Sequence, residues 1–187
     1  MQRKYSLVDR RTMIQLGSVA GIAMLAGCVD QISGVFGDEY EPGDDEAAMI
    51  NVDYFGDGWI EEDYEPDDDG PDDDDDEPDW ESGTSRLFYT EDDDEAVIAM
   101  MGIAEDSDSA AEAIDDWATA NIVGGEEIDL GDGGERGEIE GFGAVAFSHS
   151  NAGIITMAGR MAGFDIQAQH GKAYEVGEAL LDNLQDL

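Results

Sequence analysis

The hydrophobic and polar positions divide the chain into three unlike stretches. Positions 13–26 (MIQLGSVAGIAMLA) are mostly apolar, positions 29–82 are dominated by Asp and Glu, and positions 83–187 carry apolar residues at strand and helix spacings. Only the last stretch has enough regularly spaced apolar residues to build a core. The pattern therefore predicts an N-terminal signal segment (1–27), a disordered acidic stalk (28–82) and a small folded domain (83–187).

Several short runs within the last stretch predict strands. Arg86–Thr90 is rich in residues that favour strands, and Ala96–Ala104 is nearly continuously apolar. The second run suits either a strand buried on both faces or a short buried helix, and its bounded length favours the strand. Ser150–Gly153 contains Asn and Gly and is expected to turn a hairpin. Shorter strand candidates, separated by glycines, are 127–130, 138–141, 142–148 and 153–158.

Two segments predict helices. Ser109 and Glu112 fit a capping box, apolar residues follow at helical spacing, and Gly124-Gly125 is a plausible end. Asp165 is a candidate cap for the second helix. The apolar positions of the two helices are Ala110, Ile114, Trp117 and Ala118, then Ala173, Val176, Gly177, Leu180, Leu181 and Leu184. Glycines 131, 133 and 134 indicate an exposed loop. The element order predicts an α+β fold, a small antiparallel sheet with two helices packed on one face.

The charge excludes several kinds of partner. The 187 residues include 48 Asp and Glu against 8 Lys and Arg, a formal charge of −40. Nucleic-acid binding needs Lys and Arg against phosphates, so we expect no nucleic-acid partner. A single cysteine rules out an internal disulfide and any zinc site with two thiolates. Self-repulsion of so many acids weakens in molar salt, where the Debye length falls to about 3 Å.

The first 28 residues have the pattern of an export signal. Basic residues at positions 3, 4, 10 and 11 precede an apolar run that is shorter than the roughly 20 residues of a spanning helix. Arg10-Arg11, followed by Thr12, Met13 and Ile14, resembles a twin-arginine signal, although Asp9 and the missing Lys depart from the common pattern.

Leu25, Ala26 and Gly27 directly precede Cys28 and resemble the lipobox of exported lipoproteins. The family resemblance implies that Cys28 carries lipid on its sulfur and becomes the first residue of the mature chain. Two buried lipid chains hold a protein stably on a membrane. Together with the acidic composition, these features resemble a haloarchaeal Tat-exported lipoprotein, which implies the Tat translocase as a partner during export and an outward-facing location on the cell membrane.

The acidic stretch 29–82 contains no Lys or Arg. Its densest part, 67–79, is expected to be extended and disordered, so that the whole stretch forms a stalk between anchor and domain. Aromatic residues in 53–59 are expected either to be solvated or to dock on the domain or a partner. An EF-hand register with Gly70 at the sixth position is disfavoured by Pro66, Pro71 and the absence of flanking helices, and weak cation condensation is expected instead.

Candidate chemistry is sparse. His149 and His170 are the two histidines, and neighbouring Ser148 and Ser150 point to the opposite face of a strand from His149. The histidines could converge with Met157 and Met161 on copper, but nothing in the spacing requires it. We therefore name no catalytic residue, no metal ligand and no cofactor.

The sequence as a whole predicts a non-enzymatic, membrane-anchored surface lipoprotein whose domain binds a partner protein or small ligand in high salt. The alternative is a small envelope hydrolase or metal-handling protein that uses His149 and His170.

Overall fold

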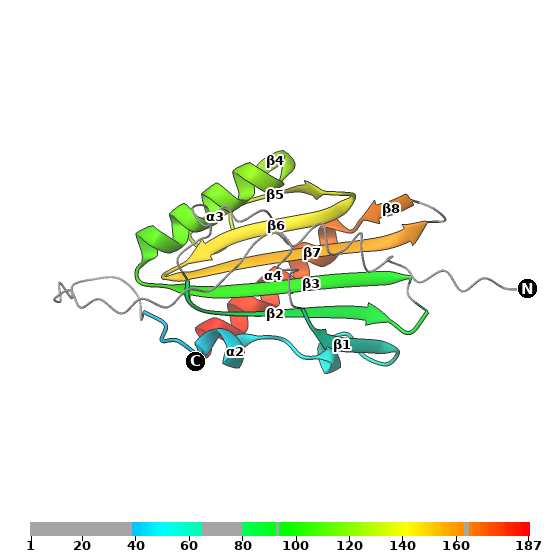
Figure 1. Ribbon diagram of the computed structural model, residues 1–187, viewed down its shortest axis with the longest axis horizontal. Helices are drawn as coiled ribbons and strands as arrows, with labels where there is room; N and C mark the ends of the chain where they lie inside the picture. The colour runs from blue at the N-terminus through cyan, green and yellow to red at the C-terminus, as the bar shows by residue number, and fades with distance from the viewer. Residues whose placement is uncertain (1–38, 65–79, 93, 163–164) are drawn as a thin grey trace, which may run out of the picture.

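The computed structural model describes residues 39–64, 80–92, 94–162 and 165–187. They form eight strands, one short 3-10 helix (η1) and three α-helices (Figure 1). In chain order these are α2 (Asp44–Ala48), η1 (Val52–Tyr54), β1 (Trp59–Asp63), β2 (Trp80–Thr90), β3 (Glu95–Ala104), α3 (Ser107–Asn121), β4 (Val123–Ile128), β5 (Gly133–Ile139), β6 (Phe142–His149), β7 (Ala152–Ala162), β8 (Asp165–Ala168) and α4 (His170–Gln185). Within these ranges no helix is long and apolar enough to cross a membrane.

All the strands join one antiparallel sheet in the order β1-β2-β3-β7-β6-β5-β4, and β8 pairs with the distal end of β7. The predicted α+β class is therefore confirmed, with a larger sheet than expected. The apolar run Ala96–Ala104 is a strand, since it forms most of β3 between β2 and β7. The predicted hairpin is also confirmed, because β6 and β7 pair directly and Ser150 takes a φ of 53° in the turn.

The expectation that both helices pack on one face is wrong. Alternate residues of the central strands form two separate cores, one with α3 and one with α4. The α4-side core includes Phe88, Val97, Phe147, Leu180 and Leu184, whereas the α3-side core includes Ile98, Ile114, Trp117, Ala144 and Met157. Figure 1 shows α4 behind the sheet and α3 in front of it. We call these two surfaces of the sheet the α4-side face and the α3-side face.

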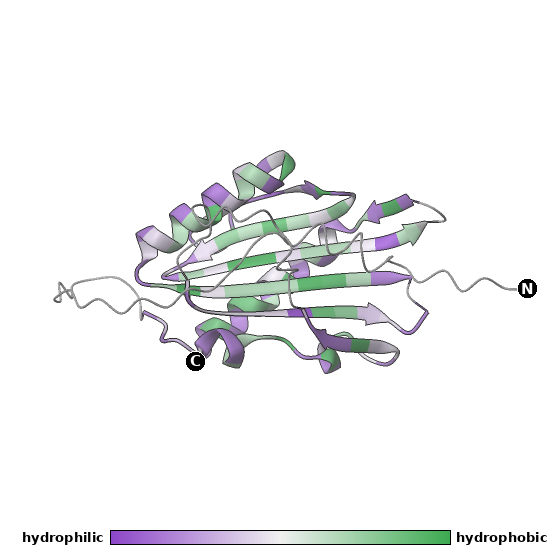
Figure 2. Ribbon diagram, in the orientation of Figure 1, coloured by the Kyte–Doolittle hydropathy of each residue, from purple (hydrophilic) through white to green (hydrophobic). Residues whose placement is uncertain are grey.

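Strands buried on both sides explain the continuous apolar runs. Seven of the eight residues of β6 are buried, and no Asp, Glu, Lys or Arg interrupts this fully described strand. The colouring in Figure 2 places the hydrophobic segments along the central strands and hydrophilic residues on the outside of α3 and at the strand ends.

The N-terminus of α3 differs from the predicted capping box. The helix begins at Ser107, and Asp106 is its N-cap, because Asp106 Oδ1 accepts a hydrogen bond from the Ser109 amide at 2.8 Å. This hydrogen bond from Ser109 lowers the pKa of Asp106. Gly124-Gly125 does not end the helix but lies in β4.

Three further boundaries are corrected. Asp165 begins β8, and α4 starts at His170. Glycines 133 and 134, expected in a loop, open β5, while Glu140 and Gly141 form the turn into β6 with positive φ. These positions are rich in Gly and acid, so their side chains carry little information about strand pairing.

The most consequential correction concerns the acidic stretch 28–82. Residues 39–64 are part of the fold, since β1 pairs with β2 from Trp59↔Thr90 to Asp63↔Arg86. Ala48 and Ile50 are buried in the α4-side core. The Asp-rich run 65–79 therefore connects β1 to β2, two adjacent strands of one sheet. It does not separate an anchor from a domain.

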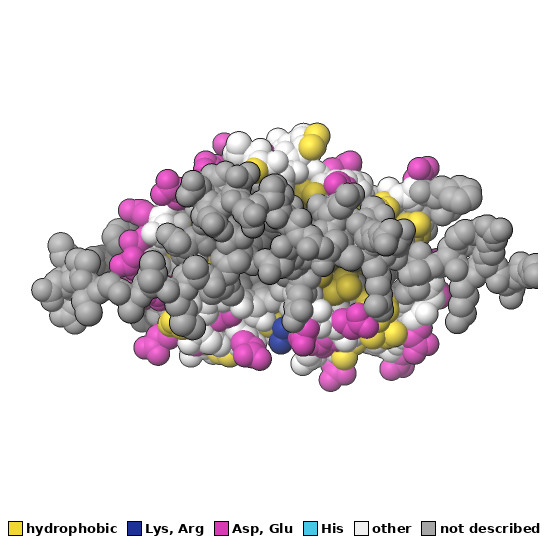
Figure 3. All heavy atoms as spheres, viewed as in Figure 1, with side chains coloured by type: hydrophobic (Ala, Val, Ile, Leu, Met, Phe, Trp, Pro, Cys, Tyr) yellow, Lys and Arg dark blue, Asp and Glu magenta, His cyan; other side chains and the backbone are white. Residues whose placement is uncertain are grey.

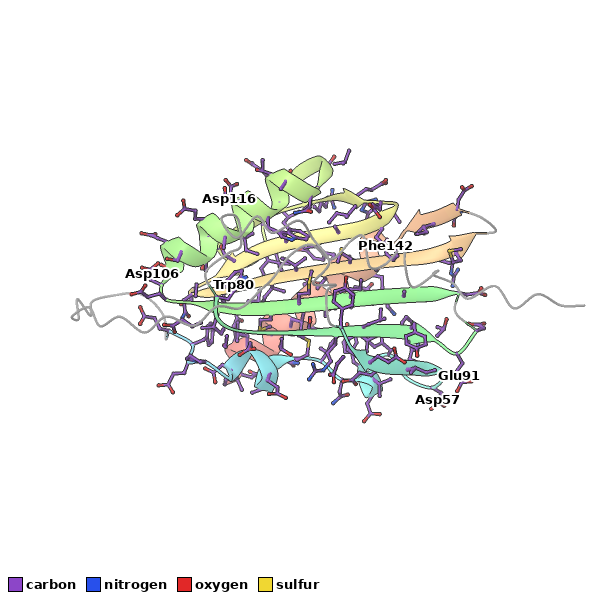
Figure 4. The ribbon with its side chains drawn as sticks, viewed as in Figure 1. Asp57, Trp80, Glu91, Asp106, Asp116 and Phe142 are labelled. Atoms are coloured by element: carbon purple, nitrogen blue, oxygen red, sulfur yellow. The ribbon has the colours of Figure 1, made fainter. Side chains whose placement is uncertain are left out.

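Trp80 closes the α3-side face at the start of β2. A methyl group added at Gly102 or Gly153 would lie 2.4 Å or 2.3 Å from its indole ring. These two glycines are paired across β3 and β7, so together they form a shallow seat for the ring. Figure 4 labels Trp80 near the start of α3 and Phe142 toward the other end of the sheet.

Candidate interaction surface

The two histidines lie at opposite ends of β6. His149 is its last residue, whereas the His170 backbone packs against Gly143, where a methyl group would lie 2.6 Å from the His170 nitrogen. Six residues of strand separate Gly143 from His149, a distance of roughly 20 Å. A shared catalytic or metal site for the two histidines is therefore not assembled.

Each histidine faces one carboxylate. His149 Nδ1 lies 3.7 Å from Asp132 Oδ1, too far for a hydrogen bond, and His149 Nε2 lies 3.3 Å from the Gln185 amide nitrogen. His170 Nε2 lies 3.4 Å from Glu138 Oε1, and both side chains are largely exposed. Neither arrangement contains a nucleophile aligned with a base.

The proposed copper set is also dispersed. Met157 is buried in the α3-side core, and Met161 pairs with Ile166 where β7 meets β8. Over the ranges that the structure covers, no group of three or more His, Cys, Asp or Glu side chains is placed to hold a metal ion. The acidic run considered for calcium lies outside the described residues.

The residues of the export and lipidation pattern, Arg10, Arg11, Leu25, Ala26, Gly27 and Cys28, lie outside the described residues. The described fold starts at Glu39, shortly after Cys28.

An aromatic cluster on the α4 side of β1 is the strongest candidate for an interaction surface. Phe55 stacks on Trp59 with ring centroids 4.6 Å apart, and it also contacts Phe88 at 4.8 Å. Tyr54 meets Phe55 edge-on at 5.1 Å. We call Tyr54, Phe55 and Trp59 the aromatic ridge. Because Phe55 packs on Phe88, residues 53–59 dock on the domain, which is one of the two alternatives expected from the sequence.

Local backbone chemistry shapes the ridge. The Asn51 side chain accepts a hydrogen bond from the Asp53 amide and caps η1. Gly56 and Gly58 take φ values of 86° and 87°, which few other residues adopt, and they turn the chain from η1 into β1. Phe55 and Trp59 thereby come to lie on one side of the chain.

Lys172 of α4 holds the ridge on the domain. Its Nζ lies 5.0 Å from the centroids of both the Phe55 and the Trp59 rings, within cation–π range. The Tyr54 hydroxyl donates a 3.3 Å hydrogen bond to the Glu175 carbonyl. Partial burial, followed by the charges of Glu175 and Glu178, raises the pKa of Tyr54. The hydroxyl therefore stays protonated and acts as a donor at neutral pH.

Part of the ridge remains open to solvent. Tyr54 is 46 % exposed and is one of the large hydrophobic side chains that protrude from the described surface, with Ile60, Val123 and Leu187. Asp53 and Asp57 flank it, and Figure 4 labels Asp57 and Glu91 beside β1. The surface thus combines a rigid aromatic centre with an acidic rim, a composition typical of protein interfaces that meet a basic rim.

Arg86 of β2 ties the folded part of the acidic stretch to the sheet. Its guanidinium lies 3.1 Å from Asp63, 3.4 Å from Glu61 and 3.8 Å from Glu46. Glu61 also accepts a 2.9 Å hydrogen bond from the Val52 amide, so α2, η1 and β1 all connect to this one cation. The Arg86 and Glu61 side chains are 21 % and 30 % exposed, so solvent screens this pair only in part, whereas Glu46 and Asp63 are 76 % and 81 % exposed.

Two further hydrogen bonds fix α2. Asp45, which is 3 % exposed, accepts a hydrogen bond from the Ser82 hydroxyl at 2.8 Å. Asn183 of α4 donates to the Ala48 carbonyl at 3.0 Å. Sequence reasoning missed these contacts and the role of Arg86. The signal that could have indicated the role of Arg86 is its position as a lone Arg after a long acidic stretch without Lys or Arg.

Comparisons with known proteins leave the family open. No protein-family model and no curated protein matches the chain. A solved structure described as a GTP-binding regulator from Thermotoga maritima aligns with 56 % of this chain and 66 % of that one, just under two thirds, at 16 % identity and a TM-score of 0.38. A likeness this weak transfers neither fold family nor function.

Replacing Arg86 with Met tests its role in fixing residues 39–64. The variant leaves three carboxylates close together without their cation, so we expect a loss of about 1–3 kcal/mol in unfolding free energy, increasing as salt is lowered. Urea denaturation at several KCl concentrations measures it.

Arg136→Met is the matched control. Arg136 pairs with one exposed carboxylate, Glu126, at 2.7 Å, and such surface pairs contribute about 0–1 kcal/mol. Equal losses for the two variants would contradict the assignment to Arg86.

Proposed function

We propose that this chain is an exported lipoprotein, held on the outer side of the cell membrane by lipid on Cys28, and that its α+β domain is a non-enzymatic binding module. The anchor is supported by the only cysteine of the chain standing directly behind Leu25-Ala26-Gly27 and a short apolar run preceded by Arg10-Arg11. The described fold is built from Glu39 onward, so processing before Cys28 leaves all of it intact.

A high-salt environment is supported by the contacts that Lys and Arg side chains make in the described part of the chain. Arg86, Arg136 and Arg160 pair with carboxylates, and Lys172 lies over aromatic rings. The described part has no further Lys or Arg to offset the other acids on the surface, where magenta dominates the charged atoms of Figure 3. Molar salt removes most of the resulting repulsion.

The aromatic ridge carries the proposal of a binding module. Tyr54 and Trp59 are large, rigid side chains with few rotatable bonds, the residue types that dominate binding energy at interfaces. The surrounding Asp and Glu side chains favour a partner whose apolar centre is bordered by Lys or Arg. We therefore propose an envelope protein with such a basic-rimmed apolar patch as the partner.

Cys28→Ser tests the anchor. Without the thiol the lipid has no attachment site, so the variant should accumulate as unprocessed precursor or appear in the medium. Membrane fractionation with detergent extraction, together with the mass of the N-terminal peptide, measures this. Unchanged membrane association with an unmodified cysteine in the parent chain would refute the anchor.

Tyr54→Ala tests the ridge, with Val123→Ala as the matched control. Val123 is 73 % exposed in β4, the opposite edge strand, so both changes remove an exposed apolar side chain. We expect the partner recovered with the purified chain from solubilised membranes in high salt to fall at least tenfold for Tyr54→Ala and to stay unchanged for Val123→Ala. Equal recovery with both variants would contradict the ridge as the binding surface.

A further inference from the structure

The α3-side face carries no charged side chain on its central strands, as far as the structure describes them. Strand register places Leu87 and Tyr89 of β2 beside Ile98 and Ala96 of β3, and these beside Met157 and Gly159 of β7. Ala144 and Ala146 of β6 continue the row. Ala96, Ile98, Met157, Ala144 and Ala146 are each at most 3 % exposed, so in a chain with 48 acids this uncharged row across four strands is buried.

Described elements cover only part of this face. In Figure 1, α3 runs from the end of β3 across β6 and β5 and leaves the front of β2 and of most of β3 without a described helix. Trp80 occupies the end near Gly102 and Gly153. Leu87, Tyr89 and Met100 pack on the α3-side core as partly buried side chains.

An unsatisfied donor lies on the same side. Trp117 of α3 is 6 % exposed and belongs to the α3-side core, yet its indole Nε1 has no hydrogen-bond partner among the described residues. A buried donor without an acceptor costs free energy, so an occupant with carbonyl oxygens complements this face better than a purely hydrocarbon one.

The chain enters the described fold at one end of the sheet, where Tyr40 packs on the α4-side core. The Tyr40 amide donates to Asn151 Oδ1 at 2.8 Å, and Asn151 donates back to the Tyr40 carbonyl and to the Ala104 carbonyl at 3.0 Å each. Asn151 is in the β6–β7 turn, next to the Gly153–Trp80 end of the face. Residues 37–39 span about 10 Å when extended, enough to pass around the end of the sheet.

The sequence just before this point has a matching composition. Residues 29–36 (VDQISGVF) contain Val29, Ile32, Val35 and Phe36 and a single acid. An extended segment of this length reaches roughly 26 Å, which covers the roughly 20 Å from Gly102 to Ala96 along β3. The acidic run 65–79 contains only Asp, Glu, Pro and Gly and has no large apolar side chain to offer.

We propose that the α3-side face is the docking site for residues 29–36 of the same chain, with Phe36 nearest Trp80 and Val29 toward the β2–β3 turn. A main-chain carbonyl of the docked segment accepts the Trp117 indole hydrogen bond. The docking does not depend on lipidation. Where Cys28 carries lipid, as proposed above, the docked segment holds the domain close to the membrane, and the β2–β3 end of the sheet faces the membrane.

The first test compares two double variants of the full chain in molar salt. Ile32→Asp with Phe36→Asp places charge at apolar positions, whereas Gln31→Asp with Ser33→Asp adds the same charge to polar positions of the same segment. We expect the thermal midpoint of the first pair to fall by about 3–10 °C relative to the second. Equal midpoints would overturn the docking.

A disulfide cross-link distinguishes the occupants. Phe36→Cys combined with Met100→Cys is expected to form an intramolecular disulfide, while Phe36→Cys with Asp116→Cys on the outer surface of α3 forms none. A disulfide-linked dimer would show that a second copy of the chain occupies the face. The absence of any cross-link would show that another ligand occupies it. Either result overturns the proposal.

The two proposals fail separately. Peptide mass mapping of the same sample reports whether Cys28 is lipidated, so a bare Cys28 together with the engineered cross-link between positions 36 and 100 would refute the anchor and retain the docking. A lipidated Cys28 without that cross-link would refute the docking and retain the anchor.

Discussion

The pairing of β1 with β2 constrains the rest of this structure. Five residue pairs, from Trp59↔Thr90 to Asp63↔Arg86, bring the first described segment into the sheet. Once these strands are neighbours, the acidic run 65–79 has to return to the sheet it left, so it is a connection within the domain. The proposed lipid anchor at Cys28 then lies about ten residues before the described fold, a distance of at most roughly 35 Å along an extended chain.

Electrostatics make this pairing notable. β1 is the sequence WIEED, and a strand with three acids at the edge of an acidic domain is self-repelling. Arg86 compensates by meeting carboxylates from α2 and β1 at once, and Lys172 adds cation–π contacts to Phe55 and Trp59. Two of the few cations in the described part thus hold the N-terminal segment in place, while the charged edge discourages pairing with other chains.

Much of the domain after Gly83 was predictable, because apolar periodicity carries strong information there. The strand assignment of Ala96–Ala104, the β6–β7 hairpin and the apolar faces of both long helices are confirmed. An amphipathic helix shows that one of its sides is buried but not which face of a sheet receives it, so the placement of α3 and α4 on opposite faces could not be read from the pattern. The nearly continuous apolar runs of β3 and β6 are the indications that both faces are covered.

The N-terminal half was predicted poorly for a physical reason. Acid density in residues 39–64 suggested disorder, since compositional rules cannot see that Phe55 packs on Phe88 or that Arg86 is far away in sequence and near in space. The aromatic ridge was noticed in the sequence only as a possible docking element. The sequence offered His149 and His170 only for the alternative hydrolase or metal-handling function, and their roughly 20 Å separation along β6 leaves no shared site for them.

Cleavage within 65–79 tests the central claim most directly. A site-specific protease sequence introduced around Gly70-Pro71 allows the chain to be cut there, in molar salt, and the products to be separated by size-exclusion chromatography. If β1 is part of the sheet, the two fragments co-elute as one particle and separate only in denaturant. If the two fragments elute apart without denaturant, residues 39–64 do not belong to the domain and the account is wrong.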